Sequence, residues 1–107
     1  MSKINSKFGA CTVSKNIYEG KGNLKWCIKE ESKREADNGW VFLSDIDTEE
    51  YLSNFNNFCI LSFETLIEIE PAILSIYDMK IGTELTLLQE GDKKFFINTN
   101  TGVPLSF

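Results

Sequence analysis

The sequence contains no histidine, which removes the commonest general base and the commonest metal ligand of proteins. Its three cysteines, Cys11, Cys27 and Cys59, are widely spaced and form no CxxC pair, so they match neither a disulfide framework nor a zinc-binding pattern. Each lies among apolar residues, where we expect a reduced, buried thiol. We therefore expect a protein that is not an enzyme and that needs no cofactor and no metal.

Arginine and long apolar runs are also scarce. Arg34 is the only arginine, and the pI is near 4.7, so we expect no nucleic-acid partner, because binding to phosphates depends on clustered basic residues. No apolar run approaches the roughly 20 residues that span a bilayer. The first residues are polar and lack the apolar core of a signal peptide. These features predict a cytoplasmic protein without a membrane partner.

The 107 residues, 42% of them hydrophobic, fit one domain over residues 1–107. We predict an α+β fold, a mostly antiparallel twisted sheet of about five to six strands with two or three short helices. Alternating or buried apolar patterns predict strands at residues 8–13, 24–29, 40–43, 59–63, 84–88 and 94–98. Helical spacing follows residue 64, and Pro71 should divide that segment into two short helices.

Two local patterns lead to specific expectations. Leu24, Trp26 and Ile28 alternate with polar residues and Cys27, which predicts that Trp26 packs in the core. Asp47 precedes a short helix and has a glutamate three residues later, which is typical of a helix N-cap.

Residues 30–50, called here the acidic segment, carry eight acidic residues against two basic ones. Such a segment can attract a basic partner, although charge runs are more often simply solvated. Burial is the favoured interpretation of Trp40, but the acidic loop before it makes it a candidate exposed anchor. The candidate partner-binding residues are Glu30, Glu31, Arg34, Glu35, Asp37, Trp40, Asp45, Asp47, Glu50 and Tyr51. A calcium loop beginning at Asp45 fails, because its sixth and twelfth positions are not the required glycine and glutamate.

The order of several short motifs resembles the Immunity protein 33 family over about residues 10–95. The matching motifs are Val13-Ser14-Lys15, Lys25-Trp26, Lys29-Glu30, Asp37-Asn38-Gly39-Trp40, Asp47 with Glu50-Tyr51, Glu70-Pro71-Ala72-Ile73 and Ile81-Gly82-Thr83-Glu84. Two positions depart from the family pattern: Asn38 replaces a serine, and Lys29 stands where arginine is common. Lysine keeps the charge but loses the planar fork that binds carboxylates with two hydrogen bonds.

The resemblance implies a cytosolic antidote of a bacterial polymorphic-toxin system, which binds a cognate toxin and blocks it without chemistry. The acidic segment would complement a toxin with a basic substrate cleft. The alternative is a small regulatory or ligand-binding module unrelated to toxins, although nothing in the sequence points to a small-molecule ligand.

Overall fold

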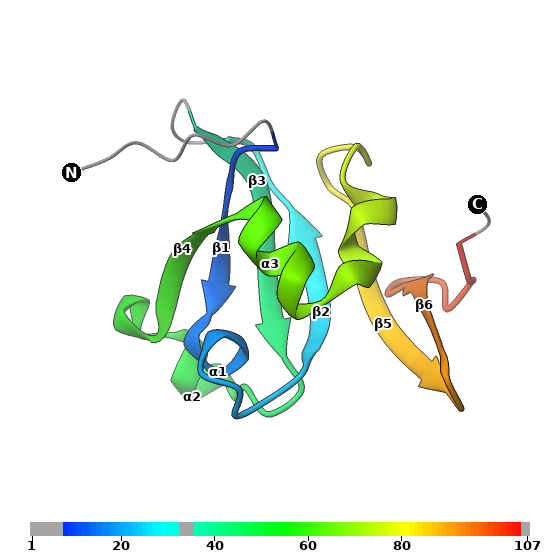
Figure 1. The fold of residues 1–107 in the computed structure, drawn as a ribbon, viewed down its shortest axis with the longest axis horizontal. Coiled ribbons are helices and arrows are strands. Elements are labelled where there is room, and N and C mark those ends of the chain that lie inside the picture. Colours follow the sequence, from blue (N-terminus) through cyan, green and yellow to red (C-terminus); the bar gives the residue numbers. More distant parts are fainter. Residues whose placement is uncertain (1–7, 33–35, 106–107) are drawn as a thin grey trace.

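The structure is a computed structural model that describes residues 8–32 and 36–105. Six strands form one sheet in the spatial order β4-β1-β3-β2-β5-β6 (Figure 1). Their bounds are Ala10–Ser14 (β1), Leu24–Lys29 (β2), Asp37–Ser44 (β3), Phe58–Ser62 (β4), Glu84–Glu90 (β5) and Lys93–Asn98 (β6). The predicted α+β class is confirmed, and each predicted strand is present: β2 has the predicted ends, and the other five are shifted at one or both ends.

The sheet is mixed because β3 is inserted between β1 and β2. Strand β3 is parallel to β1 and antiparallel to β2, and the other three pairings are antiparallel. Strand β6, which forms a hairpin with β5, lies at one edge of the sheet. There Pro104, in the segment after β6, forms an isolated β-bridge with Ile97. Strand β4 forms the opposite edge.

The described helices are short. They are the α-helices Lys15–Tyr18 (α1), Glu49–Leu52 (α2) and Phe63–Ile69 (α3), and the 3-10 helices Phe55–Asn57 (η1) and Pro71–Ile76 (η2). The predicted division at Pro71 is confirmed, since this proline occupies the first turn of η2. The predicted N-cap of α2 is wrong by one residue. The Thr48 hydroxyl accepts a hydrogen bond from the Tyr51 amide, whereas the Asp47 carboxylate accepts hydrogen bonds from β1, α1 and the end of β3.

One apolar core lies between the sheet and the helices α1, α3 and η2. In Figure 1, α3 lies in front of the central strands, and its buried Phe63 contacts Phe42 with ring centroids 6.2 Å apart. The buried apolar residues form one cluster, which consists of Cys11, Val13, Ile17, Leu24, Cys27, Trp40, Phe42, Phe63, Leu66, Ile73, Ile76, Leu85, Leu87 and Phe96. Every buried apolar residue of the described helices belongs to this cluster.

The prediction that Trp26 lies in this core is wrong. Between Leu24 and Trp26, β2 advances two residues while β3 advances one, so β2 contains a bulge. The extra residue reverses the alternation of side chains, and Cys27 instead of Trp26 then faces the core opposite Phe42. Trp26 and its neighbour Ile28 lie half-buried on the other face of the sheet.

Among the described helices, none is long and apolar enough to cross a membrane.

Candidate protein-interaction surface

The structure separates the acidic segment into two parts. Strand β3 passes through the middle of the sheet, with Glu30, Glu31 and Asp37 near its start and Asp45 just beyond its end. Seven residue steps of about 3.3 Å separate the two ends of this strand, a distance of roughly 23 Å. The acidic segment therefore does not form one continuous surface. Two of its candidate residues, Arg34 and Glu35, lie outside the described residues.

Trp40 is not an exposed anchor. Its side chain is 0% exposed, because it lies on the face of β3 that the helices cover. Its indole Nε1 donates a hydrogen bond to the Tyr77 carbonyl oxygen at 3.0 Å, and its ring stacks on Phe42 with centroids 5.7 Å apart. The Lys29 ammonium lies 5.4 Å from the Trp40 ring centroid and donates to the same Tyr77 carbonyl at 3.1 Å. The family position Lys29 thus connects β2 to the segment after η2.

The turn before Trp40 also uses its polar residues within the fold. Gly39 has a φ of +86°, and a Cβ atom at this position would lie 2.1 Å from the carbonyl oxygen of Glu30. Only glycine fits both the backbone conformation and this close approach. The Asp37 carboxylate accepts from the Gly39 amide at 2.9 Å, and the Asn38 side-chain oxygen accepts from the Trp40 amide at 2.9 Å. The family motif at residues 37–40 is therefore largely structural.

Asp47 ties three elements together. Its Oδ1 accepts hydrogen bonds from the hydroxyls of Ser14 at 2.9 Å and Ser44 at 2.6 Å, and from the Asn16 side-chain amide at 2.8 Å. Its Oδ2 accepts from the Ser44 amide at 2.7 Å. Partial burial raises the pKa of Asp47, but these hydrogen bonds to the ionised form outweigh it and leave the pKa below its usual value. Asp47 therefore acts as an internal brace between β1, α1 and the end of β3.

Several other residues at this end of the sheet remain available to a partner. Asp45, Glu49 and Glu50 are exposed, and Tyr51 is half-buried. They are accompanied by three exposed apolar side chains, Tyr18 at 57%, Ile46 at 51% and Phe55 at 88% exposure. We call the six exposed residues the α2-end surface: Tyr18, Asp45, Ile46, Glu49, Glu50 and Phe55.

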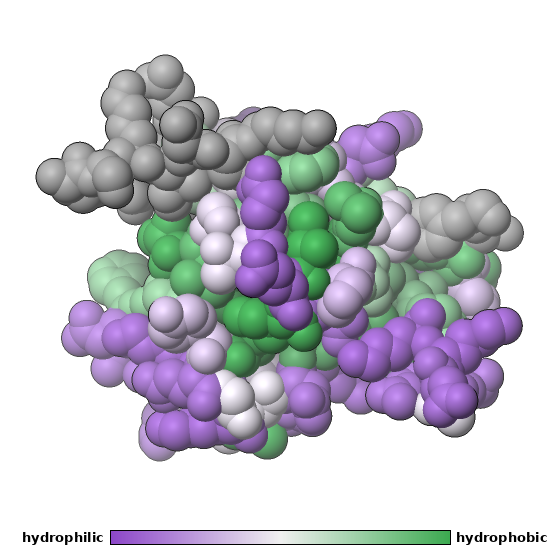
Figure 2. Space-filling model, in the orientation of Figure 1, coloured by the Kyte–Doolittle hydropathy of each residue, from purple (hydrophilic) through white to green (hydrophobic). Residues whose placement is uncertain are grey.

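Hydrogen bonds hold the segments of the α2-end surface in place. The Asn16–Asp47 bond joins α1 to the loop between β3 and α2, and the Asn57 side chain donates to the Tyr51 carbonyl oxygen at 2.8 Å, which joins α2 to η1. Figure 1 shows α1 and α2 at the same end of the sheet, and Figure 2 shows hydrophilic residues gathered there. The result is an acidic surface with apolar side chains on a braced scaffold.

The sequence interpretation missed the three apolar residues of this surface. Phe55 carried a usable signal, because it stands between Asn54 and Asn56 without an apolar stripe that would bury it. Tyr18 and Ile46 gave no comparable signal, since each lies in a turn-rich stretch whose exposure depends on the fold.

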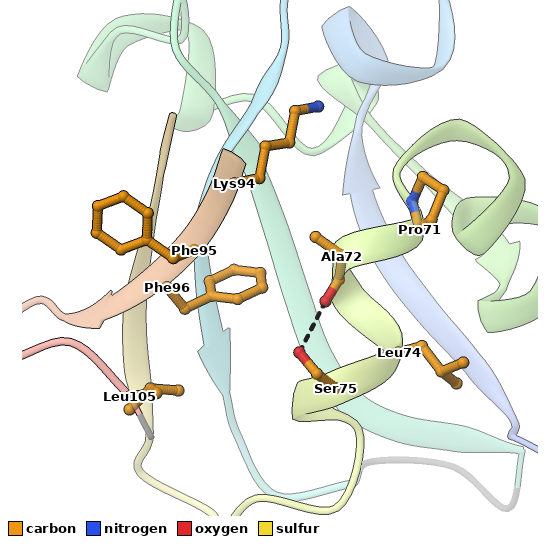
Figure 3. Close-up of a pocket in the computed structure, with 8 residues that line it drawn as sticks. All are labelled: Pro71, Ala72, Leu74, Ser75, Lys94, Phe95, Phe96 and Leu105. Atoms are coloured by element: carbon orange, nitrogen blue, oxygen red, sulfur yellow. Dashed lines mark hydrogen bonds between the residues drawn. The ribbon is translucent and has the colours of Figure 1, made fainter. Parts of the chain in front are cut away.

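A surface hollow of about 390 Å³ lies between η2 and β6 (Figure 3). Its size is within the range of small-ligand sites, which usually combine apolar walls with a few converging polar groups. Here the Lys94 ammonium is paired with the Glu70 carboxylate at 2.5 Å, and the Ser75 hydroxyl donates to the Ala72 carbonyl oxygen at 3.0 Å. The Lys94 ammonium and the Ser75 hydroxyl therefore already have partners within the protein, and the geometry does not favour a ligand-binding role.

Metal sites and reactive thiols each have requirements with which the described residues can be compared. Within residues 8–32 and 36–105, no group of three or more cysteine or acidic side chains could hold a metal ion. All three cysteines are free thiols; Cys11 and Cys27 are buried as predicted, whereas Cys59 is only half-buried. Burial raises the pKa of Cys11 to about 12 and also raises the pKa values of Cys27 and Cys59, so the reactive thiolate is disfavoured at each position.

Comparison with known proteins identifies a family. A family model described as the Immunity protein Imm33 domain matches residues 11–96, which is most of the chain. No curated protein and no solved structure matches. The matched range contains the bulged strand β2, the turn at residues 37–40, the Asp47 brace and the whole α2-end surface. The chain therefore belongs to the Imm33 family of immunity proteins.

Proposed function

We propose that this protein neutralises a cognate bacterial toxin in the cytoplasm by binding it non-covalently, without catalysis. Membership of an immunity-protein family is the observation that carries this proposal. A stoichiometric inhibitor needs a stable scaffold and an accessible surface, and it needs no reactive group. The unreactive thiols and the braced α2-end surface are consistent with such a role.

We further propose that the toxin binds at the α2-end surface. Residues 45–57 contain four acidic residues and no basic residue, so this segment attracts a basic partner. Phe55 is suited to fill a pocket of that partner, since burial of an exposed phenylalanine contributes about 1.5–3 kcal/mol. An apolar anchor with charged residues around it is the usual composition of an interaction hot spot.

The exposed acids at the other end of β3 provide a matched control. We expect the double variant Glu49→Lys, Glu50→Lys to slow association with the toxin by about tenfold or more at low salt, and this loss should shrink as salt increases. The variant Glu30→Lys, Glu31→Lys makes the same charge change near the opposite end of β3 and should have a much smaller effect. Phe55→Ala should instead accelerate dissociation.

The readout is growth of cells that co-express each variant with the toxin identified by co-purification with the wild-type protein from its host, together with binding kinetics of the purified pair. Melting temperatures establish that each variant is folded. If the Glu30/Glu31 variant fails to protect and the Glu49/Glu50 variant protects fully, the toxin binds at the opposite end of the sheet. If wild-type protein binds no such toxin, the proposed function is wrong.

A further inference from the structure

The second face of the sheet is apolar although no described helix buries apolar residues against it. Antiparallel sheets with one solvated face normally carry polar side chains on that face. Here Trp26, Ile28, Val41 and Leu43 occupy the outer face of the two central strands and are only half-buried. None of the four belongs to the core cluster or to the half-buried residues packed against it. This face is therefore a separate apolar surface.

The register of the sheet aligns these residues into two rows. In the first row, Ile60 of β4 is opposite Thr12, which is opposite Val41, followed by Ile28 and Glu84. In the second row, Leu43 of β3 is opposite Trp26, followed by Thr86 and Ile97. We call the apolar members the open-face patch: Ile28, Ile60, Val41, Leu43, Trp26 and Ile97. Ile60 is 48% exposed, and the other five are half-buried.

The charges indicate which partner this face fits. The two rows contain nine residues, of which only Glu84 at one end is charged, and the Lys25 ammonium lies 5.8 Å from the Trp26 ring centroid, so the two opposite charges leave the face with little net charge. A basic toxin gains nothing electrostatically here, whereas the acidic α2-end surface attracts it. A second copy of this chain, in contrast, is best accommodated by a face with little net charge. With a net charge of −5, two copies repel each other least when they meet on a face of low net charge.

We propose that two copies of this protein associate through the open-face patch, sheet against sheet, about a twofold axis. In a twofold interface the same patch meets itself, and an apolar row of similar side chains satisfies that condition. The two sheets would pack about 10 Å apart with their strands rotated by about 30°, as in a β-sandwich. The core of each protomer lies on the other side of its sheet, so the dimer would have three apolar layers.

The available area supports a weak dimer. Six strands at about 4.8 Å spacing and five residues of about 3.3 Å rise make a face of roughly 500 Å² in projection. Two such faces would bury on the order of 1,000 Å², which is close to the lower limit for a specific interface. We therefore expect dissociation in the micromolar range. The α2-end surface lies at the end of the sheet and would remain free for the toxin.

The test uses the purified full chain alone, so its outcome does not depend on the toxin. Sedimentation velocity from about 1 to 300 μM should show a monomer–dimer equilibrium, a range chosen for interfaces of this size. Ile28→Lys places an ammonium in the patch and should raise the dissociation constant by at least tenfold. Ile81→Lys adds the same charge at a side chain that is 61% exposed in the turn before β5, and it should leave the equilibrium unchanged.

Tryptophan fluorescence gives a second measurement on the wild-type protein. Trp40 is 0% exposed, so quenching by acrylamide should report mainly on Trp26, and quenching should weaken as the protein dimerises. A protein that stays monomeric with unchanged quenching over the whole range overturns the proposal. An equal loss of dimer in the Ile28 and Ile81 variants also overturns it, because the dimer would then form elsewhere. If Ile28→Lys fails to fold, the wild-type sedimentation and quenching still decide.

Discussion

The Asp47 brace gives the sharpest stability prediction. Replacing Asp47 with alanine removes the acceptor for four hydrogen bonds and leaves the hydroxyls of Ser14 and Ser44, both 0% exposed, without this partner. A buried polar group that loses its hydrogen bond costs about 1–3 kcal/mol. Because the carboxylate itself is only partly buried and water can replace some of its bonds, we expect a total loss of about 2–4 kcal/mol.

The expected loss is a large part of the 5–15 kcal/mol that usually stabilises a small domain. It corresponds to a fall in melting temperature of roughly 10–25 °C for a chain of this size. Asp45→Ala is the matched control, since it removes the same charge two residues earlier from an exposed site. Asp45 accepts from the Asn23 amide at 2.9 Å near solvent, and its removal should cost less than about 1 kcal/mol.

The pH dependence of stability distinguishes the hydrogen bonds of the ionised Asp47 carboxylate from simple packing of its side chain. The pKa of Asp47 is lowered in the folded state, so its ionised form contributes stability above the ordinary value of 3.8, and this contribution is lost as the pH falls through the folded pKa. Asp47→Asn should therefore destabilise strongly at pH 7. The asparagine side chain has an NH2 group in place of one carboxylate oxygen, and this donor would face another donor, either the Ser44 backbone amide or the groups that now bind Oδ1. Its deficit relative to wild type should shrink below pH 3.8. Equal melting of Asp45→Ala and Asp47→Ala at pH 7 would refute the reasoning.

Two further outcomes follow from the geometry of the fold. Gly39→Ala should destabilise by roughly 3–5 kcal/mol in denaturant melts, because it combines a left-handed backbone with a Cβ position 2.1 Å from a carbonyl oxygen. Gly91→Ala, with a φ of +60° and no heavy atom within 4 Å, should lose only about 1–2 kcal/mol, and a reversed order would contradict the account. Thiol labelling of the native protein should modify half-buried Cys59 before buried Cys11 and Cys27, and rapid labelling of all three would show that the core opens readily.

Much of the fold was predictable from local patterns. The hairpin of β5 and β6 and the break at Pro71 depend on residues close together in the sequence, and both were predicted correctly. The faces of β2 were not predictable in this way. One bulged residue reverses the alternation of side chains between the two faces of the sheet. The bulge is a feature of the pairing between β2 and β3, in which β2 advances two residues while β3 advances one. Local periodicity contains no information about that pairing.

The candidate site was predicted less well, for a related reason. A charged segment in the sequence is a surface only if the fold keeps its residues together, and β3 passes through the acidic segment and separates its ends. Asp47 has the composition of a surface residue, but Ser14 and Asn16, more than 30 positions away, turn it inward. The family resemblance was confirmed because it depends on the order of motifs along the chain, which the sequence preserves directly.

The most direct test of the central claim is a growth-rescue assay with the toxin that co-purifies with the wild-type protein from its host. Cells expressing that toxin alone should die, and cells that also express the wild-type protein should grow. The two purified proteins should form a stable complex without covalent modification of either chain, which intact-mass measurement can establish. Cells that die although the folded protein is present at equal or higher levels than the toxin would contradict the account, as would rescue that leaves the toxin cleaved or modified.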